Sequence, residues 1–414
     1  MNDTALYHHL LGLVPPWTVS SVDLSTKDKR VTVRVEHNKK ATFTCPECGA
    51  KCGLHDHDQE RTWRHLDSCH FETYLVARVP RVRCPEHGVR VVKVSWADAK
   101  SRFTLLFERF AIDVLLETDV SGAASILGIS WDEAHHIMER AVRRGLIRRE
   151  TRAPKTMGID EKALAKGHRY GTLVNDLERG VVIEVSEGRT KESLYKALGD
   201  FSIDELAQVE AVAMDMWEPF VSVIKDVVSG ADHKIVFDRF HIVAHMNEAL
   251  DQVRRAENKA LRAEGSDVLV GSKHLWLYAA ENVPAHRRDE FAALRATKLR
   301  TARAWSMKEV LRGLWDCTSR KMGEWWWKKW KGWADRCRLA PVRKVAAMIE
   351  RHLPNVLSYF RHRVTNAGSE SINSVIQLLK KRAFGYRSFN NFRTAILFRC
   401  GGLDLYPEAH PIVG

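Results

Sequence analysis

Two nearly identical pentapeptides, CPECG at residues 45–49 and CPEHG at residues 84–88, limit what the amino-terminal part of this chain can fold into. Each follows a segment in which apolar and polar residues alternate, which predicts β-strands. Two ligands three residues apart can turn toward one point, and the following glycine allows the positive φ of the turn. The pattern predicts one tetrahedral, structural Zn²⁺ site, with no coordination position open for catalysis. Its ligands would be Cys45, Cys48, Cys84 and His87.

The other cysteines leave this interpretation open to alternatives. Eight cysteines in 414 residues are too few for a disulfide scaffold, and four lie between residues 45 and 69. This clustering favours metal ligands in a reducing compartment, although two coincidental turns in a β-domain are the simpler alternative. Nearby residues could replace one ligand or hold a second ion, but a surface role is the plainer interpretation for them. They are Cys52, His55, His57, Cys69 and His70.

The overall charge indicates a class of partner. Lysine and arginine outnumber aspartate and glutamate by 65 to 52, a net charge of +13. This excess favours a polyanion, either nucleic acid or an anionic membrane surface. No run approaches the roughly 18 apolar residues of a membrane span, and the first 13 residues lack a secretory signal. A hydrophobic fraction of 45% excludes a largely disordered chain.

The pattern of apolar residues over 103–144 predicts three helices after the amino-terminal β-strands. A short helix over 120–127 and a turn at 127–129 precede Ser130, whose side chain can cap the next helix. Glu133, three residues later, completes a capping box. Helix, turn and capped helix indicate a helix-turn-helix, whose last helix enters a DNA major groove. A plain three-helix packing module is the alternative.

The expected DNA contacts lie at the two ends of this last helix. The residues predicted near base edges are Ser130, Trp131 and His135. Basic residues then lead into a new domain, a position that favours phosphate contacts although such runs are usually solvated. They include Arg143, Arg144, Arg148 and Arg149.

From Thr156 the pattern changes to that of a mixed α/β domain. Helices separate the third, fourth and fifth strands, and a further helix begins near His241. This order is that of a ribonuclease-H-like fold, in which the first and fourth strands are neighbours. Asp160 and Asp215 lie on those strands, and such paired carboxylates bind divalent cations for in-line phosphoryl displacement. The predicted strands are residues 156–161, 168–176, 181–188, 209–216 and 233–240.

A third carboxylate is needed on a helix that faces these strands, and Glu370 is the best candidate. A surface helix with a solvated glutamate is the alternative. At 100° per residue, one face of this helix is polar and the opposite face is apolar. The polar face carries Glu370, Asn373, Gln377, Lys380 and Lys381. The basic residues expected to contact DNA beside the acid are Lys380, Lys381 and Arg382.

The segment between the second and third acids is longer than the fold requires. Residues 264–360 read as helical, which predicts an all-α insertion. Eight of the 13 tryptophans lie there. We expect most of them to be buried, with Trp326, Trp330 and Trp333 as the stripe of one helix, while one or two contacting a DNA end is a further hypothesis.

In this order, the motifs resemble those of DDE transposases of bacterial insertion sequences, in the ISL-three (ISL3) family with a zinc ribbon. The resemblance runs from about residue 40 to about residue 400. Besides the two pentapeptides, the matching motifs are LGIS at 127–130, GIDEKA at 158–163, AMDMWEPF at 213–220, FDRFHI at 237–242, NAGSESIN at 366–373 and KKRAFGYRSFNNFRTAIL at 380–397.

The resemblance implies a catalytic triad of Asp160, Asp215 and Glu370 with Mg²⁺ or Mn²⁺. It also implies catalytic support from a D-x-x-H motif matched by Asp238 and His241, for which a helix-capping pair is the alternative. Ser371 departs from the pattern, since the family often has glycine after the third acid.

The expected fold is an α+β multidomain chain. Its predicted parts are a zinc-ribbon β-domain over 1–98, a helix-turn-helix domain over 99–150, the first part of a ribonuclease-H-like core over 151–263, the all-helical insertion over 264–360 and C-terminal core helices over 361–414.

The expected function is that of a transposase that binds the terminal inverted repeats of its insertion sequence, hydrolyses phosphodiesters and transfers strands. Its partners would be terminal and target DNA and further copies of itself, as a homodimer or higher oligomer, with no membrane. Its expected location is the bacterial cytoplasm, at the nucleoid. The alternatives are a catalytically silent zinc and helix-turn-helix regulator, and a nuclease or resolvase without strand transfer.

Overall fold

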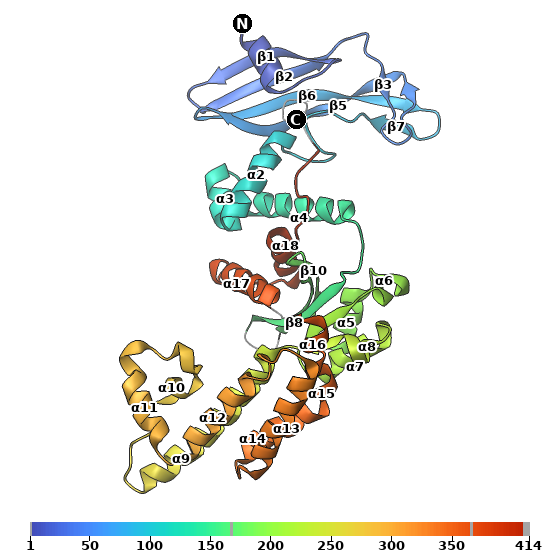
Figure 1. Cartoon of the computed structure of the whole chain (residues 1–414). Coiled ribbons are helices and arrows are strands. Elements are labelled where there is room, and N and C mark those ends of the chain that lie inside the picture. Colours follow the sequence, from blue (N-terminus) through green and yellow to red (C-terminus); the bar gives the residue numbers. More distant parts are fainter. Residues whose placement is uncertain (1, 166–168, 365–366, 409–414) are drawn as a thin grey trace. The chain divides into compact units, whose positions relative to one another are not determined.

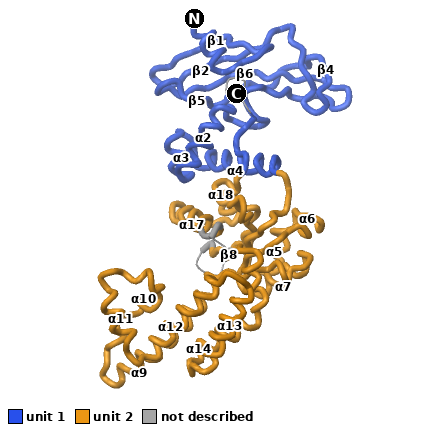
Figure 2. Tube along the Cα trace, in the orientation of Figure 1, with its two compact units in different colours: residues 1–149, 403–414 blue, residues 150–402 orange. Residues whose placement is uncertain are grey.

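The computed structural model describes residues 2–165, 169–364 and 367–408, apart from a few side chains beside the gaps. The chain divides into two compact units (Figure 2). Unit 1 contains residues 1–149 and the C-terminal segment from Leu403, and unit 2 contains residues 150–402. The chain therefore passes between the units twice.

The sheet of unit 1 has the order β1-β2-β6-β5, with β7 paired to β6 (Figure 1). β2 and β6 are parallel, and the other pairs are antiparallel. Val33, Leu75 and Trp63 are paired across three strands and are fully buried, so this row anchors the core. The elements are α1 (Asp3–Leu10), β1 (Trp17–Ser25), β2 (Arg30–His37), β3 (Phe43–Thr44), β4 (Lys51–Cys52), β5 (Leu54–Ser68), β6 (Phe71–Cys84) and β7 (Gly88–Val91).

Three helices complete this unit, as the sequence predicts: α2 (Leu105–Glu117), α3 (Val120–Leu127) and α4 (Trp131–Arg148). α3 ends at Gly128, which has a φ of 64°. The predicted capping box at the start of α4 is confirmed, since Ser130 and Glu133 bond to each other's backbone amides. The turn and the cap together define the helix-turn-helix.

The C-terminal segment belongs to the same unit because it packs on α4. A β-carbon at Gly145 would lie 2.6 Å from Cβ of Leu403, so only glycine fits this approach. Leu405 is buried, and its carbonyl oxygen accepts a 2.7 Å hydrogen bond from Arg144. Tyr406 Oη donates a 2.6 Å hydrogen bond to Asp113 of α2. The segment therefore joins α2 to α4.

The sheet of unit 2 has the order β10-β9-β8-β11-β12. β8, β9 and β10 form an antiparallel meander, whereas β11 runs parallel to β8 and β12. Ala213 of β11 pairs with Gly158 of β8, which confirms that the first and fourth strands are neighbours. The strands are β8 (Thr156–Ala165), β9 (Arg169–Asp176), β10 (Val181–Glu187), β11 (Ala211–Met214) and β12 (Ile235–Phe237).

The two C-terminal helices of this unit pack against the sheet. α17 contacts β8, and α18 contacts β10. The helices outside the insertion are α5 (Lys191–Leu198), α6 (Ile203–Ala207), α7 (Glu218–Val227), α8 (Ala231–Lys234), α17 (Ala367–Arg382) and α18 (Phe389–Cys400).

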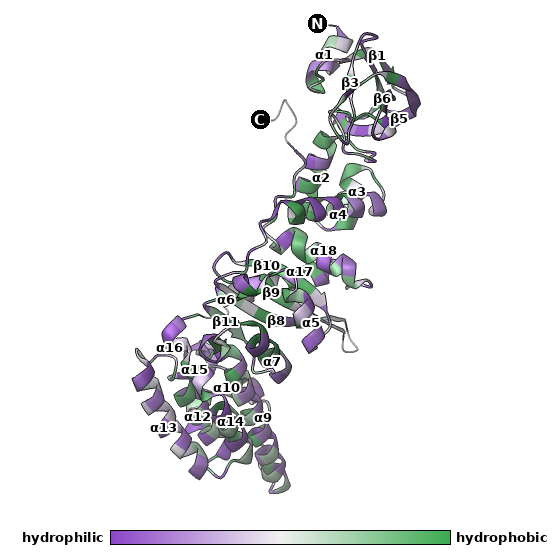
Figure 3. Cartoon of the chain, turned by 90° about the vertical axis from the view of Figure 1, so that its right-hand side faces the viewer, coloured by the Kyte–Doolittle hydropathy of each residue, from purple (hydrophilic) through white to green (hydrophobic). Residues whose placement is uncertain are grey.

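Between β12 and α17 the described chain is helical, as expected. The long helices mix hydrophilic and hydrophobic residues along their length (Figure 3), as amphipathic helices do. No helix in the described parts of the chain is long and apolar enough to cross a membrane. The helices are α9 (Arg239–Ala263), α10 (Lys273–Leu277), α11 (Arg288–Ala296), α12 (Arg300–Arg312), α13 (Arg320–Arg336), α14 (Ala340–Arg351), α15 (Leu353–Leu357) and α16 (Tyr359–His362), with short 3₁₀ turns at Ala280–Asn282 and Ala285–Arg287.

Of the three tryptophans predicted to form the buried stripe of α13, only Trp330 is fully buried. Trp327 and Trp330 are buried, whereas Trp326 and Trp333 are only partly buried. Trp330 Nε1 donates a 2.8 Å hydrogen bond to the carbonyl oxygen of Met307 in α12. The stripe continues through Gly323 and Ala334, a 4-3-4 spacing that suits an α-helical face as well as the predicted one.

Candidate functional site

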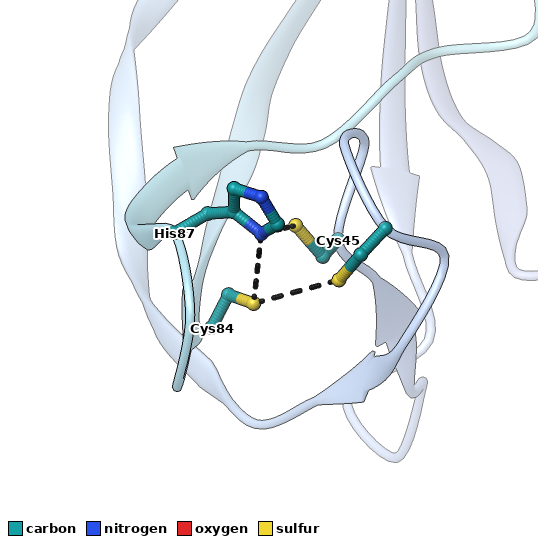
Figure 4. Close-up of side chains that lie close together, drawn as sticks. Cys45, Cys84 and His87 are labelled. Atoms are coloured by element: carbon teal, nitrogen blue, oxygen red, sulfur yellow. Dashed lines mark hydrogen bonds between the residues drawn. The ribbon is translucent and has the colours of Figure 1, made fainter.

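The predicted zinc ligands are together in unit 1. Figure 4 shows Cys45, Cys84 and His87 turned toward a common point. The Sγ atoms of Cys48 and Cys84 are 3.7 Å apart, and His87 Nδ1 lies 3.9 Å from Cys45 Sγ and 3.6 Å from Cys84 Sγ. The ligand atoms of all four residues lie within 4.8 Å of one another.

These distances fit zinc. Bond lengths of about 2.3 Å to sulfur and about 2.0 Å to nitrogen put tetrahedral ligand atoms roughly 3.5–3.8 Å apart. Gly49 and Gly88 have φ values of 74° and 69°, as the turns require. Backbone amides of His87 and Glu86 lower the pKa of the Cys84 thiol to about 7, which favours the thiolate that binds metal.

The neighbouring cysteines and histidines have other contacts. Cys52 Sγ lies 3.3 Å from the carbonyl oxygen of Ala50. His57 stacks on His37, and their Nε2 atoms are 2.8 Å apart. Among the residues that the structure describes, the candidate metal group contains only the four predicted ligands.

The start of α4 carries two of the residues predicted to read DNA. Trp131 is 42% exposed, and its ring stacks on His135 at 4.9 Å with an interplanar angle of 9°. His135 is buried, and burial lowers the pKa of its imidazole. Ser130 caps the helix. The exposed indole of Trp131, which stacks on the ring of His135, is therefore available for contacts at this end of α4.

The basic residues at the other end of α4 differ in their surroundings. Arg143 is exposed. Arg144 contacts Asp98 at 2.9 Å and Glu108 at 3.2 Å, and Arg148 contacts Asp404 at 2.8 Å. Arg149 also has an interaction partner. Arg144 and Arg148 thus hold the C-terminal segment in unit 1, a role that the sequence did not indicate.

In unit 2, Asp160 and Asp215 lie at the same level of two neighbouring inner strands, at the carboxyl end of β11. Asp160 is on β8 and is 8% exposed, and Asp215 directly follows β11. Since Ala213 is level with Gly158, the two aspartates are level on adjacent strands. Gly158 leaves room for Leu177 and for α17, because a β-carbon there would lie 2.7 Å from Leu177 Cδ2 and 3.2 Å from Ser369 Oγ.

A histidine lies beside the second acid. His241 Nδ1 is 3.6 Å from Asp215 Oδ2, and its Nε2 is 4.0 Å from Asp238 Oδ2. Asp238 also caps α9, since its Oδ1 accepts a 3.0 Å hydrogen bond from the amide of Phe240. Asp238 therefore caps a helix and at the same time lies next to His241.

The third predicted acid is on α17, but the side chain of Glu370 lies outside the described residues. One turn further along, Asn373 Nδ2 donates a 2.8 Å hydrogen bond to Asp160 Oδ2. The helix that carries Glu370 is thus tied to the first acid. Lys380 of the same helix contacts the carbonyl oxygen of Ala163, and Lys381 and Arg382 are exposed.

Two interactions beside these aspartates were not predicted. Lys162 Nζ lies 3.1 Å from Asp160 Oδ2; its position two residues along the same strand puts it on the same face, which was the available signal. Glu161 forms an ion pair with Arg189, whose guanidinium lies 4.2 Å from the ring centre of Trp217. Burial raises the pKa of Glu161, and Arg189 opposes the rise.

Comparisons with known proteins agree with this arrangement. A family model described as transposase, of the ISL3 type, matches residues 157–396. A zinc-finger model of transposases IS204, IS1001, IS1096 and IS1165 matches residues 41–87, and a helix-turn-helix model of transposase family ISL3 matches residues 92–142.

Curated relatives match over most of their length. The transposase for insertion sequence element IS1557 of Mycobacterium tuberculosis is 29% identical over 422 residues, covering 94% of this chain and 93% of the relative. The transposase for IS1001 of Bordetella parapertussis is 25% identical over 354 residues, covering 84% of this chain and 86% of the relative.

Proposed function

This chain belongs to the ISL3 family of transposases, and from that premise we propose that it cleaves and joins DNA through Asp160, Asp215 and Glu370. The substrate is the terminal inverted repeat of its own insertion sequence, and the product 3′-hydroxyl attacks target DNA. The observation that carries the proposal is the level placement of Asp160 and Asp215 on adjacent strands with α17 tied to β8.

The donor set fits a divalent cation. Mg²⁺ and Mn²⁺ prefer oxygen ligands. The site contains the carboxylates of Asp160 and Asp215 and lies beside the helix that carries the third. Asn373 Oδ1 is buried, with no hydrogen-bond partner among the described residues, so a further oxygen is available there. When bound, the metal would activate the attacking oxygen and stabilise the leaving oxygen of an in-line displacement.

The protein's own groups have separate tasks in this reaction. Asp160, Asp215 and Glu370 would hold the metal, and Asn373 orients Asp160. His241, between the carboxylates of Asp215 and Asp238, can hold a proton at either ring nitrogen. In the first step water oxygen attacks phosphorus and the 3′-oxygen leaves; in the second, the freed 3′-hydroxyl attacks a target phosphate and displaces its 3′-oxygen.

DNA recognition is assigned to unit 1 and to α17. The exposed Trp131 and the capped start of α4 meet base edges, while Arg143 and the Lys381–Arg382 pair contact phosphates. Zn²⁺ bound to the four ligands would hold the two turns of the β-domain without taking part in the chemistry. Unit 2 is interpreted as a ribonuclease-H-like core with a helical insertion. Pairing two DNA ends calls for a dimer or higher oligomer, and the expected location is the bacterial nucleoid.

The test is cleavage of end-labelled duplexes that carry the element's own termini. We expect wild type to nick them with Mg²⁺ or Mn²⁺, and Asp215→Asn to lose at least 100-fold in rate while it still binds the duplex. Asp204→Asn, at an exposed acid in the first turn of α6, is the matched control and retains activity. Wild type that binds the termini but never cuts them would instead identify a catalytically silent regulator.

A further inference from the structure

Both carboxylate oxygens of Asp160 contact polar groups of the protein. Its Oδ1 accepts a 2.7 Å hydrogen bond from the amide of Glu161. Its Oδ2 accepts a 2.8 Å hydrogen bond from Asn373 Nδ2 and forms an ion pair with Lys162 Nζ, which lies 3.1 Å away. The amide group is neutral and can remain beside a metal ligand, but the ammonium group is a cation on the oxygen that a metal would use.

Lys162 is held in this position. Its side chain is 17% exposed and that of Asp160 is 7% exposed, so water screens the pair only weakly. The neighbouring basic residue of α17, Lys380, is directed to the carbonyl oxygen of Ala163 instead. Asp215 differs, since its near neighbour is the imidazole of His241. Of the two aspartates, Asp160 is therefore the one whose side chain is paired with a lysine.

Resting on the proposed function, we propose that Lys162 is an internal cation that competes with the divalent metal for Asp160 until a DNA phosphate draws the ammonium away. A lysine side chain is flexible and binds phosphate as a point charge. A phosphate at the site would pair with Lys162 and free Asp160 Oδ2. DNA would then increase metal affinity, and by linkage metal would increase DNA affinity by the same factor. Metal uptake would thereby be favoured in the DNA-bound protein.

The competition is measured as Mn²⁺ affinity of the full-length protein, by electron paramagnetic resonance of free Mn²⁺, without DNA and with a terminal duplex. Without DNA, Lys162→Met should bind Mn²⁺ about 5- to 10-fold more tightly than wild type, because the competing charge is gone. Lys162→Arg keeps the charge and should remain close to wild type. With DNA, wild type should approach Lys162→Met.

Lys155→Met is the matched control. Lys155 also pairs with a carboxylate, Glu210, at 3.4 Å, but it lies at the other end of β8. Its removal should leave Mn²⁺ affinity unchanged. Thermal unfolding of each variant verifies folding, and Lys162→Gln provides a second neutral variant if the methionine variant is unstable.

Two different failures are distinguishable. If Asp215→Asn abolishes Mn²⁺ binding but both neutral Lys162 variants bind as wild type does without DNA, the competition is refuted and the proposed function stands. If wild type and Asp215→Asn bind Mn²⁺ equally, both with and without DNA, the proposed metal-dependent function is wrong. The proposed role of Lys162 is then refuted as well.

Discussion

Asn373 and Asp160 are 213 residues apart in the chain, and the amide of Asn373 donates a 2.8 Å hydrogen bond to the Asp160 carboxylate. Partners that orient a metal ligand typically contribute 10- to 100-fold in metal affinity or activity. We therefore predict that Asn373→Ala lowers the single-turnover cleavage rate by about 10- to 100-fold while DNA affinity is retained.

Asn390→Ala, at an exposed asparagine of α18, is the control for this measurement and should cleave at the wild-type rate. Equal rates for Asn373→Ala and wild type would show that Asp160 does not depend on this bond.

The four ligands of unit 1 predict one zinc ion per chain. Metal binding contributes directly to the folding free energy of such a domain. The Cys84→Ser variant should therefore lose the zinc, and its β-domain should become sensitive to proteolysis. Elemental analysis and limited proteolysis measure the two effects. Cys69→Ser, at an exposed cysteine outside the cluster, should keep both zinc and protease resistance; loss of zinc in that variant would show that the ligand set is different.

The contact between Gly145 and Leu403 predicts that replacing this helical glycine with alanine destabilises unit 1, although the same change usually stabilises a helix. Alanine is a better helix former than glycine by about 1 kcal/mol, yet a β-carbon at Gly145 would lie 2.6 Å from Leu403 Cβ. Overpacking of this kind costs about 1–3 kcal/mol. Gly145→Ala should therefore lower the free energy of unfolding of unit 1, measured in urea.

Gly332→Ala in α13 is the opposite control, since its nearest neighbours are 3.6 Å away on the side chain of Arg336, and it should be neutral or stabilising. Removing residues 403–414 should abolish the cost of Gly145→Ala. A cost that persists in the truncated chain would have a cause within the helices.

The stacked pair Trp131 and His135 predicts a dependence of stability on pH. Burial lowers the pKa of His135 below its ordinary value of 6.5. As the pH falls through 6.5, the unfolded chain therefore takes up a proton that the folded ring does not, and the free energy of unfolding decreases. Above pH 6.5 the ring is neutral in both states and contributes no slope.

His135→Gln should remove this contribution, so the stability difference between the variant and wild type should shift in favour of the variant between pH 7.5 and 5.5. Urea unfolding at each pH measures it. A constant difference over this range would mean that His135 titrates alike in both states.

The features that were predictable from sequence are those set by neighbouring residues. Ligands three residues apart must face one point in a turn, which is why the four residues from Cys45 to His87 were identifiable. The capping box of Ser130 and Glu133 spans a single helical turn. Hydrophobic periodicity placed Asp160 and Asp215 on strands, and the order of strands implied that these would be adjacent.

Tertiary structure decided which groups these residues meet. Arg144 and Arg148 read as a basic run for DNA, but the C-terminal segment, about 260 residues later, returns to them. Lys162 and Asn373 converge on one oxygen of Asp160 from the same strand and from a distant helix. On α13, Trp327 and Trp330 are buried against neighbouring helices, while the predicted Trp326 and Trp333 pack only partly against the core. Local sequence determines backbone conformation through short-range sterics and hydrogen bonds, whereas the partner of a charge depends on which distant segments pack beside it.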